Sequence, residues 1–439
     1  MENIVGIRTE TIDSTECRAP LTPKQVKTLI YQHRIDVLIE PSGSRIFKEN
    51  EYEQAGARVN SDLSGCNIIF GLKEVPIPDI IPGKPYCIFS HTAKGQRHNM
   101  PMLKRFIEAG NTLLDYELVR NDKGRRIIAF GEFAGYAGMI DSLWVLGRRL
   151  RSIGIENPFE EIRQANSYYS LAEAESAIRE VGKRIQEEGL PSQIVPFLCG
   201  FTGYGKVANA AQYIFDLLPV VNILPDALPS FFDSGKFSNN VVYPIAFKKA
   251  HLYERSASEA GFDLQEFNSH PEQYQSRFEK FVPYLTMIIH GIYWEPRFPR
   301  ILTKRFLKSL YSPSSQPRLQ VIGDITCDIE GSIEVTVKAT NSKNPVYVYE
   351  PSTDRPIDGW EGHGPVVLAV DKLPTELPVE SSNAFGETLL PFVPPLVAAD
   401  YNVPREELTI PLEFIKAVIV HQGTLTSDFQ YLAAHIHET

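Results

Sequence analysis

The sequence predicts an α/β protein built from two domains, each with a mostly parallel β-sheet. With 439 residues, the chain exceeds what one hydrophobic core usually serves. Apolar segments of strand length alternate with helical patterns through residues 4–115, which is typical of parallel sheets. In mid-chain, a glycine turn joins an apolar strand to the start of a helix.

The first part of the chain contains five short apolar segments that we expect to form strands. Thr22 is expected to cap a helix that has Pro23 at its first position. A second helical pattern covers residues 102–109. The five expected strands are residues 4–7, 36–40, 66–71, 86–90 and 112–115.

The pattern becomes strongly helical after Gly135. We expect helices over residues 138–150 and 170–188, then strands that end near Gly291 and cover 322–325. The α/β rhythm therefore continues past the glycine turn.

Composition narrows the classes of function. The net charge is −10, and a nucleic-acid surface is not expected because phosphate binding needs clustered Lys and Arg. Five well-separated cysteines without a CxxC pair predict neither disulfides nor a metal site. No apolar segment approaches the roughly 18 residues of a transmembrane helix, and the N-terminus does not match a signal peptide. We expect a cytoplasmic protein without a membrane partner.

The glycine turn, Gly-Tyr-Gly-Lys-Val-Ala at residues 203–208, matches the dinucleotide-binding pattern. Gly203 permits the tight turn, Gly205 lets the backbone approach a pyrophosphate, and the helix N-terminus holds the anion. The next strand is expected at residues 221–224, with Asp226 just after it. Asp226 fits a ribose contact and a helix cap equally well, so the choice between NAD and NADP stays open.

Polar residues follow two expected strands of the first part, where open α/β sheets place their ligands. A lysine and a histidine there can divide the acid–base work of a hydride transfer. From the residues alone, a surface lysine, a loop histidine and surface arginines are the favoured interpretation. The candidates are Lys73, Glu74, His91 and Lys94, with Arg18, Arg125 and Arg126 as possible carboxylate clamps.

Several ordered motifs resemble lysine–2-oxoglutarate reductase, which forms saccharopine and occurs as the N-terminal half of bifunctional aminoadipic semialdehyde synthase. More distantly, the chain is similar to lysine-forming saccharopine dehydrogenase, alanine dehydrogenase and the transhydrogenase nucleotide-binding domain. The similarity runs almost end to end without the saccharopine-cleaving half, so we expect a stand-alone reductase module. The motifs are RxETxxxxECRAPLTP, GLKEVP, FSHTAK, LLDYELVxxDxGRRIIAFGEFAGYAGM, FTGYGKVANAAQ, HGIYWEPRFPRILTK and VDKLPTELPVESS.

The resemblance implies an acid–base pair, acidic neighbours that tune it, arginines that hold the oxo-acid carboxylates, and an ion pair at the edge of the site. The acid–base pair is Lys73 and His91, and the acidic neighbours are Glu74 and Glu117. The arginines are Arg18 and Arg126, and the ion pair is Lys94 with Asp371. The implied reaction is a reductive amination. The ε-amine of lysine condenses with 2-oxoglutarate to an imine, which a hydride from NADPH or NADH reduces to saccharopine. The resemblance slightly favours NADPH.

The chain departs from the family pattern in the cofactor segments. Tyr204 and Lys206 stand where the reductases usually carry a small residue and Asn. His290 replaces the usual Asn near the expected nicotinamide loop, although a satisfied loop histidine is its plainer interpretation. The residues expected to contact the cofactor are Gly203, Tyr204, Gly205, Lys206, Val207, Asp226 and His290.

We therefore predict two Rossmann-like domains of the alanine dehydrogenase type with a cleft between them. Residues 1–138 plus 379–439 are expected to form the catalytic domain, and residues 139–378 the dinucleotide-binding domain. We expect a monomer or a small homo-oligomer. The rivals are an opine-type or alanine dehydrogenase-like reductase that uses another amine, and a non-catalytic nucleotide-binding regulator. Intact Lys73 and His91 argue against a regulator.

Overall fold

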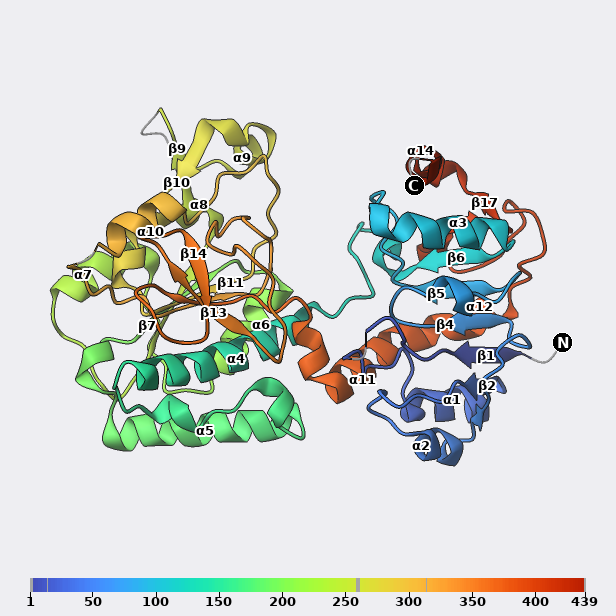
Figure 1. Cartoon of the computed structure of the whole chain (residues 1–439), viewed down its shortest axis with the longest axis horizontal. Coiled ribbons are helices and arrows are strands. Elements are labelled where there is room, and N and C mark those ends of the chain that lie inside the picture. The colour runs from blue at the N-terminus through green and yellow to red at the C-terminus, as the bar shows by residue number, and fades with distance from the viewer. Residues whose placement is uncertain (1–2, 14, 258–260, 313, 438–439) are drawn as a thin grey trace. The chain divides into compact units, whose positions relative to one another are not determined.

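The computed structural model describes residues 3–13, 15–257, 261–312 and 314–437, which form two compact units. The first unit is Met1–Phe130 with Pro378–Thr439, and the second is Gly131–Leu377. The division falls before helix α4 (Gly131–Ser152), which runs unbroken through Gly138. Each unit has its own sheet (Figure 1), and the predicted α/β class with mostly parallel sheets is confirmed.

The sheet of the first unit has eight strands in the order β17-β16-β6-β5-β4-β1-β2-β3. Strands β1 to β6 run parallel, whereas β16 and β17 are antiparallel to their neighbours. All five strands expected in the first part are present, as β1, β2, β4, β5 and β6. The strands are β1 (Ile4–Ile7), β2 (Asp36–Ile39), β3 (Arg58–Val59), β4 (Ile68–Phe70), β5 (Pro85–Ile88), β6 (Thr112–Asp115), β16 (Val418–His421) and β17 (Thr424–Leu425).

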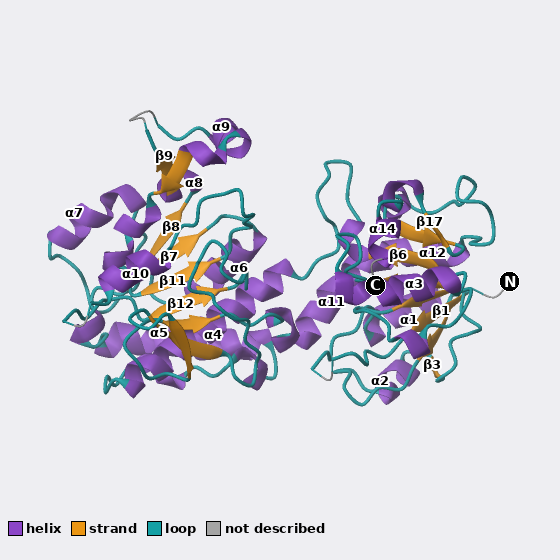
Figure 2. Ribbon diagram, turned by 45° about the horizontal axis from the view of Figure 1, so that its top comes forward, coloured by secondary structure: helices purple, strands orange, loops and turns teal. Residues whose placement is uncertain are grey.

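Helices cover both faces of this sheet (Figure 2). Neighbouring residues of each strand point to opposite sides, so each strand packs against helices on both faces. Phe70 of β4 packs in the cluster that includes α1 (Pro23–His33), and Ile69 packs in the cluster that includes α3 (Met100–Glu108). Helix α1 begins as predicted, and the Thr22 amide donates to Gln25 Oε1 at 3.0 Å. The other helices are α2 (Glu49–Gln54), α11 (Pro378–Leu389), α12 (Val393–Ala398), α13 (Leu412–Ile415) and α14 (Leu432–His437).

The second unit contains a seven-stranded sheet in the order β14-β13-β15-β12-β11-β7-β8 and a separate hairpin of β9 and β10. Five neighbouring strands of the sheet, β15, β12, β11, β7 and β8, run parallel, whereas β13 and β14 are antiparallel to their neighbours. The strands are β7 (Leu198–Thr202), β8 (Tyr243–Phe247), β9 (Tyr253–Arg255), β10 (Tyr274–Ser276), β11 (Met287–His290), β12 (Val321–Asp324), β13 (Val346–Glu350), β14 (Arg355–Asp358) and β15 (Val366–Leu368).

Helix α4 packs closely against α6 (Lys206–Phe215), the helix that follows the glycine turn. A Cβ atom at Gly135 would lie 2.2 Å from the Val207 carbonyl oxygen, so only glycine permits this approach. Both predicted helices are present, although α4 begins earlier than expected. The remaining helices are α5 (Leu171–Glu188), α7 (Leu228–Asp233), α8 (Lys249–Leu252), α9 (Leu264–Ser269) and α10 (Lys304–Leu310).

The prediction of a strand over residues 221–224 is wrong. The parallel position beside β7 is occupied by β8, whose Tyr243 pairs with Leu198. Val221 and Leu224 are 46% and 75% exposed, so the apolar segment is not buried in the sheet. It instead runs alongside the start of β8 through the hydrogen bond from the Val221 amide to the Val242 carbonyl.

A pair of carboxyl groups is buried between α4 and the 3-10 helix Leu373–Glu376. Asp141 Oδ1 accepts a hydrogen bond from the Ala165 amide at 2.7 Å, and Glu376 Oε1 accepts one from Gln164 Nε2 at 3.2 Å. Asp141 Oδ2 and Glu376 Oε2 have no donor among the described residues. Burial raises the pKa of both carboxyl groups, and the charge of Glu376 raises that of Asp141 further. A proton shared between the two groups satisfies both.

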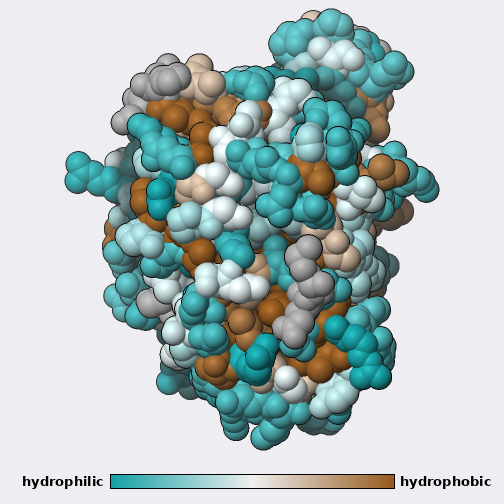
Figure 3. All heavy atoms as spheres, turned by 90° about the vertical axis from the view of Figure 1, so that its right-hand side faces the viewer, coloured by the Kyte–Doolittle hydropathy of each residue, from teal (hydrophilic) through white to brown (hydrophobic). Residues whose placement is uncertain are grey.

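One face of the first unit is visible in Figure 3, where apolar and hydrophilic residues are interspersed. Such mixing is normal, because polar atoms alone do not cover a folded domain. Among the described residues, no helix is long and apolar enough to cross a membrane.

Candidate functional site

The carboxyl ends of β1, β4 and β5 bring the predicted acid–base residues to one edge of the first sheet. Backbone hydrogen bonds join the segments just beyond these strands, from the Arg8 amide to the Phe70 carbonyl and from the Phe89 amide to the Leu72 carbonyl, both at 3.0 Å. Lys73 directly follows Leu72, and His91 lies two residues beyond Phe89. The polar residues therefore leave neighbouring parallel strands at the ligand-binding edge.

His91 and Glu74 are hydrogen-bonded, with 2.6 Å between His91 Nδ1 and Glu74 Oε1. Asn99 Nδ2 donates to both the Glu74 carboxylate and the His91 carbonyl, which fixes the pair. His91 has a φ of 47°, a left-handed conformation that non-glycine residues rarely adopt and that is concentrated at functional sites. Burial acts to raise the pKa of Glu74, but the hydrogen bond and charge of His91 and the charge of Lys73 hold it at about 2.

Glu10 fixes the backbone that carries Lys73, and sequence reasoning missed it. Its carboxylate accepts hydrogen bonds from the Leu72 amide at 2.7 Å and the Lys73 amide at 3.0 Å. Arg8 Nη1 donates to the same carboxylate at 3.1 Å. Burial raises the pKa of Glu10, against the lowering effects of Arg8 and the Leu72 amide. The only sequence signal was an acidic residue two positions after Arg8 at the end of a strand.

Arg18 is held by Glu16, a second residue that the sequence analysis did not select. The guanidinium donates from Nε and Nη2 to the two carboxylate oxygens at 2.8 and 2.6 Å. The guanidinium also lies over the Phe130 ring, 4.0 Å from its centroid. Burial acts to raise the pKa of Glu16, but the hydrogen bonds and charge of Arg18 and the charge of Lys73 hold it below its usual value. Only Nη1 of Arg18 is without a partner among the described residues.

Glu117 and Arg126 both lie near the buried Asp115. Asp115 Oδ1 accepts a hydrogen bond from the Glu117 amide at 2.7 Å, and Oδ2 accepts one from the Ser90 amide at 3.1 Å. Arg126 Nε donates to the Ile128 carbonyl at 2.8 Å, and its guanidinium stands 5.1 Å from the Phe89 ring centroid. Neither Nη of Arg126 has a hydrogen-bond partner in the described part of the chain. Arg126 is therefore better placed than Arg18 to bind an added carboxylate.

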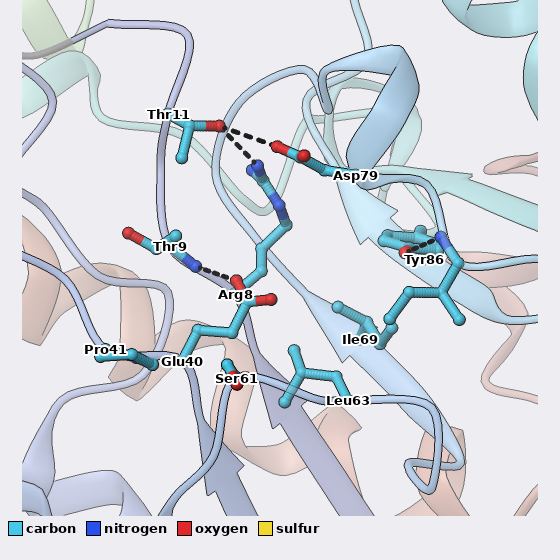
Figure 4. Close-up of a pocket in the computed structure, with 11 residues that line it drawn as sticks. Arg8, Thr9, Thr11, Glu40, Pro41, Ser61, Leu63, Ile69, Asp79 and Tyr86 are labelled. Atoms are coloured by element: carbon cyan, nitrogen blue, oxygen red, sulfur yellow. Dashed lines mark hydrogen bonds between the residues drawn. The ribbon is translucent and has the colours of Figure 1, made fainter.

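A cavity of about 260 Å³ in the first unit is lined in part by Arg8. Figure 4 shows the Arg8 side chain beside Thr11 and Asp79, with the Thr9 amide donating to the Glu40 carboxylate. Lys73 and His91 do not line this cavity. The candidate site is therefore the group of Lys73, Glu74 and His91 beyond the strand ends, and not this cavity.

The predicted edge residues Lys94 and Asp371 fall in different units. Lys94 is exposed and follows His91, while Asp371 is exposed in the second unit, where its amide donates to the Thr340 carbonyl at 3.3 Å. Their ion pair stays a prediction.

The glycine turn of the second unit has the geometry that a nucleotide pyrophosphate requires. Gly203 has a φ of 100°, and a Cβ there would lie 2.9 Å from the Ile292 side chain, so glycine is needed for both conformation and space. Gly205 caps α6, and no atom lies within 4 Å of its Cβ position. The first amides of α6 have no acceptor within their own helix. Tyr204 and Lys206 are exposed beside them, and Val207 is partly buried. These residues fit a dinucleotide.

His290 is not a loop residue, which corrects the plainer interpretation from sequence. It is the last residue of β11, is fully buried, and lies between Thr202 of β7 and Asp324 of β12 in register. The distance between Thr202 Oγ1 and His290 Nδ1 is 2.7 Å, and Nε2 has no partner among the described residues. Burial lowers the pKa of His290, against the charge of Asp324, so the imidazole is neutral at pH 7.

Asp226 does not follow the second strand of the nucleotide fold, because that strand is β8. The residue directly after β8 is Lys248, which is exposed. Asp226 instead pairs with Arg277, with 3.4 Å between Oδ1 and Nη2. A helix cap is also excluded, since no amide donates to the Asp226 side chain among the described residues.

Comparison with known proteins agrees with this geometry. Residues 6–137 match the family described as Alanine dehydrogenase/PNT, N-terminal domain. The chain is 36% identical to Alpha-aminoadipic semialdehyde synthase of Arabidopsis thaliana, over 98% of this chain and 41% of that protein. It is 26% identical to Saccharopine dehydrogenase [NAD(+), L-lysine-forming] of Emericella nidulans, over 89% of this chain and 91% of the relative. A solved L-alanine dehydrogenase aligns with a TM-score of 0.61 and 18% identity, over 99% of both chains.

These observations define an α/β protein with the alanine dehydrogenase fold, whose relatives are named as a semialdehyde synthase and a dehydrogenase. The resemblance to aminoadipic semialdehyde synthase is confirmed. The chain spans less than half the length of that relative.

Proposed function

We propose that the chain catalyses the reductive condensation of lysine with 2-oxoglutarate to saccharopine, or the reverse reaction. The observation that carries the proposal is the grouping of Lys73, Glu74 and His91 at the carboxyl edge of the first sheet. This set supplies a base, an acid and a negative charge that holds the histidine in place, which amine chemistry on a keto acid requires.

The roles follow from the contacts. The ε-amine of lysine adds to the keto carbon, and loss of water leaves an imine. The charge of Lys73 acts to lower the pKa of both Glu74 and Glu16, so the Lys73 side chain lies near these two carboxylates. His91, oriented by Glu74, donates the proton that the departing hydroxyl needs. Arg126, with both Nη groups unpartnered among the described residues, is placed for a carboxylate of the oxo acid.

The cofactor is proposed to be NADPH, which supplies the hydride that reduces the imine carbon. The residue after the second strand of a dinucleotide fold contacts the adenosine ribose, and an acidic residue there favours NAD. In this chain that residue is Lys248, with Lys249 next to it. A positive charge here suits a 2′-phosphate. Because the fungal relative is named for NAD(+), the two cofactors must be compared directly.

A scan of amines tests the proposed reaction. Purified protein receives 2-oxoglutarate, either NADPH or NADH, and one amine at a time: lysine, ornithine, alanine or ammonia. The proposal expects nicotinamide oxidation with lysine and a product of saccharopine mass. Turnover with alanine or ammonia alone would identify an alanine dehydrogenase-like reductase. Nucleotide binding without turnover on any amine would identify a regulator.

A further inference from the structure

The second unit contains a cavity of about 610 Å³ at the edge of the sheet opposite the glycine turn. Thr286 and Gln320 line it, and each directly precedes a parallel strand, β11 and β12. The glycine turn leaves the carboxyl end of β7, which runs parallel to β11. The cavity is therefore separate from the nucleotide turn, and its volume falls in the range of about 300–1,000 Å³ that small-molecule sites occupy.

Two arginines line this cavity without any carboxylate partner. Arg149 is only 5% exposed, and its guanidinium donates to the carbonyls of Trp360 at 2.6 Å and Gly362 at 2.9 Å. Arg318 donates to the carbonyls of Ile194 and Pro196. Among the described residues, neither arginine forms an ion pair. Buried charges are normally paired, so the buried Arg149 beside the partly buried Arg318 is an unusual lining for a cavity.

The lining adds no negative charge. None of the described residues that line the cavity is Asp or Glu, although the whole chain has a net charge of −10. Gln320 links the two arginines, since it accepts from Arg149 Nε at 3.4 Å and its amide contacts the Arg318 carbonyl. Arg318 Nε is buried and has no partner within the described part of the chain. His363, an exposed residue of the lining, adds a further ring nitrogen that can donate a hydrogen bond.

We propose that this cavity binds a small molecule carrying an oxyanion, either a phosphate or a carboxylate group. Arginine stays charged at neutral pH even when burial lowers its pKa, as it does for both Arg149 and Arg318. An oxyanion balances that charge, which carbonyl dipoles alone do not neutralise. This ligand would bind at the amino ends of the strands, apart from the sites proposed for the substrates and the cofactor.

Calorimetric titration of the full chain, saturated with NADPH, tests the proposal. Inorganic phosphate and succinate are titrated separately, with sodium chloride used to keep the ionic strength constant. We expect saturable binding of one of them at one site per chain, and the anion that binds shows which group the natural ligand carries. Arg318→Gln should weaken that binding about tenfold or more, the loss expected for a charged hydrogen bond.

Two further variants make the outcome decisive. His363→Glu places a negative charge at an exposed position of the lining without altering the buried arginines, and it should also weaken binding about tenfold. Arg300→Gln is the matched control, because Arg300 likewise donates to a backbone carbonyl but has Glu334 as an ion-pair partner at 3.8 Å. The control should leave the affinity within about twofold. Absence of saturable binding by both anions, or binding unchanged in His363→Glu, would overturn the proposal.

Discussion

Glu10 and Lys73 are joined through the backbone, because the Lys73 amide donates to Glu10 Oε2 at 3.0 Å. The same carboxylate accepts from the Leu72 amide, so two consecutive peptide units are held in place just before the Lys73 side chain. Glu10 is therefore a positioning residue, which acts on the chemistry through Lys73.

Replacing Glu10 by Gln should lower kcat with little change in the KM for 2-oxoglutarate. A carboxamide has one acceptor oxygen, so one of the two amides loses its partner, at a cost of about 1–3 kcal/mol in the free energy of unfolding. Steady-state kinetics and urea unfolding measure the two effects. Glu40→Gln is the control, since Glu40 also accepts from a backbone amide, that of Thr9, but does not contact Leu72 or Lys73 in the described part of the chain. An equal loss of kcat in both variants would contradict the positioning role.

Glu74→Gln should reduce the free energy of unfolding at pH 7 by about 1–3 kcal/mol, because the folded protein stabilises the ionised carboxylate of Glu74. The pKa of Glu74 is about 2 in the folded protein, below its usual value of 4.5. A lowered folded pKa contributes stability above pH 4.5 that is lost as the pH falls toward 2. Denaturant unfolding between pH 7 and pH 3 should therefore show the wild-type advantage shrinking below pH 4.5. An advantage that is independent of pH would exclude an ionic origin.

The buried pair of Asp141 and Glu376 should give the opposite pH dependence. Because burial raises both pKa values, the pair favours folding at low pH, and this contribution is lost as the pH rises through the folded pKa. Asp141→Asn keeps the acceptor for the Ala165 amide and supplies a permanent donor toward Glu376. The Tm of the variant should exceed that of the wild type at pH 8, and this difference should be smaller at pH 5. A gain that is larger at pH 5 would contradict the shared proton.

Lys248→Asp should raise the KM for NADPH about tenfold or more and lower that for NADH, because a carboxylate repels the 2′-phosphate and accepts from a ribose hydroxyl. Initial rates with each cofactor measure the change. Lys308→Asp, an exposed lysine on α10, carries the same change in charge and should leave the ratio of the two KM values unaltered. Equal effects of both substitutions would indicate a general electrostatic effect instead of a contact.

The parts that sequence predicted well depend on local patterns. The strand, glycine turn and helix around Gly203 are contiguous, and alternating apolar segments marked β1, β2, β4, β5 and β6. The segment at 221–224 was misassigned because apolar composition does not reveal that Val221 and Leu224 are exposed. Because of that error, the ribose contact was expected at Asp226 instead of at the residue that follows β8.

The missed residues depend on long-range contacts. Glu10 contacts Leu72 and Lys73, more than 60 residues away, and no spacing rule connects them. Glu16 was detectable in principle, because an acidic residue two positions before Arg18 in an extended segment can reach its guanidinium. The sequence predicts a strand that ends near Gly291, and β11 does include His290, so the plainer interpretation of a loop histidine is wrong.

The most direct test of the central claim is nicotinamide absorbance with purified protein, lysine and 2-oxoglutarate, with NADPH and NADH compared and the product identified by mass. We predict lysine-dependent oxidation, faster with NADPH, that yields a product of saccharopine mass. The activity should be lost in Lys73→Met and His91→Gln, while both variants still bind the nucleotide. Tight nucleotide binding by the wild-type protein without lysine-dependent turnover on either cofactor would contradict the proposed function.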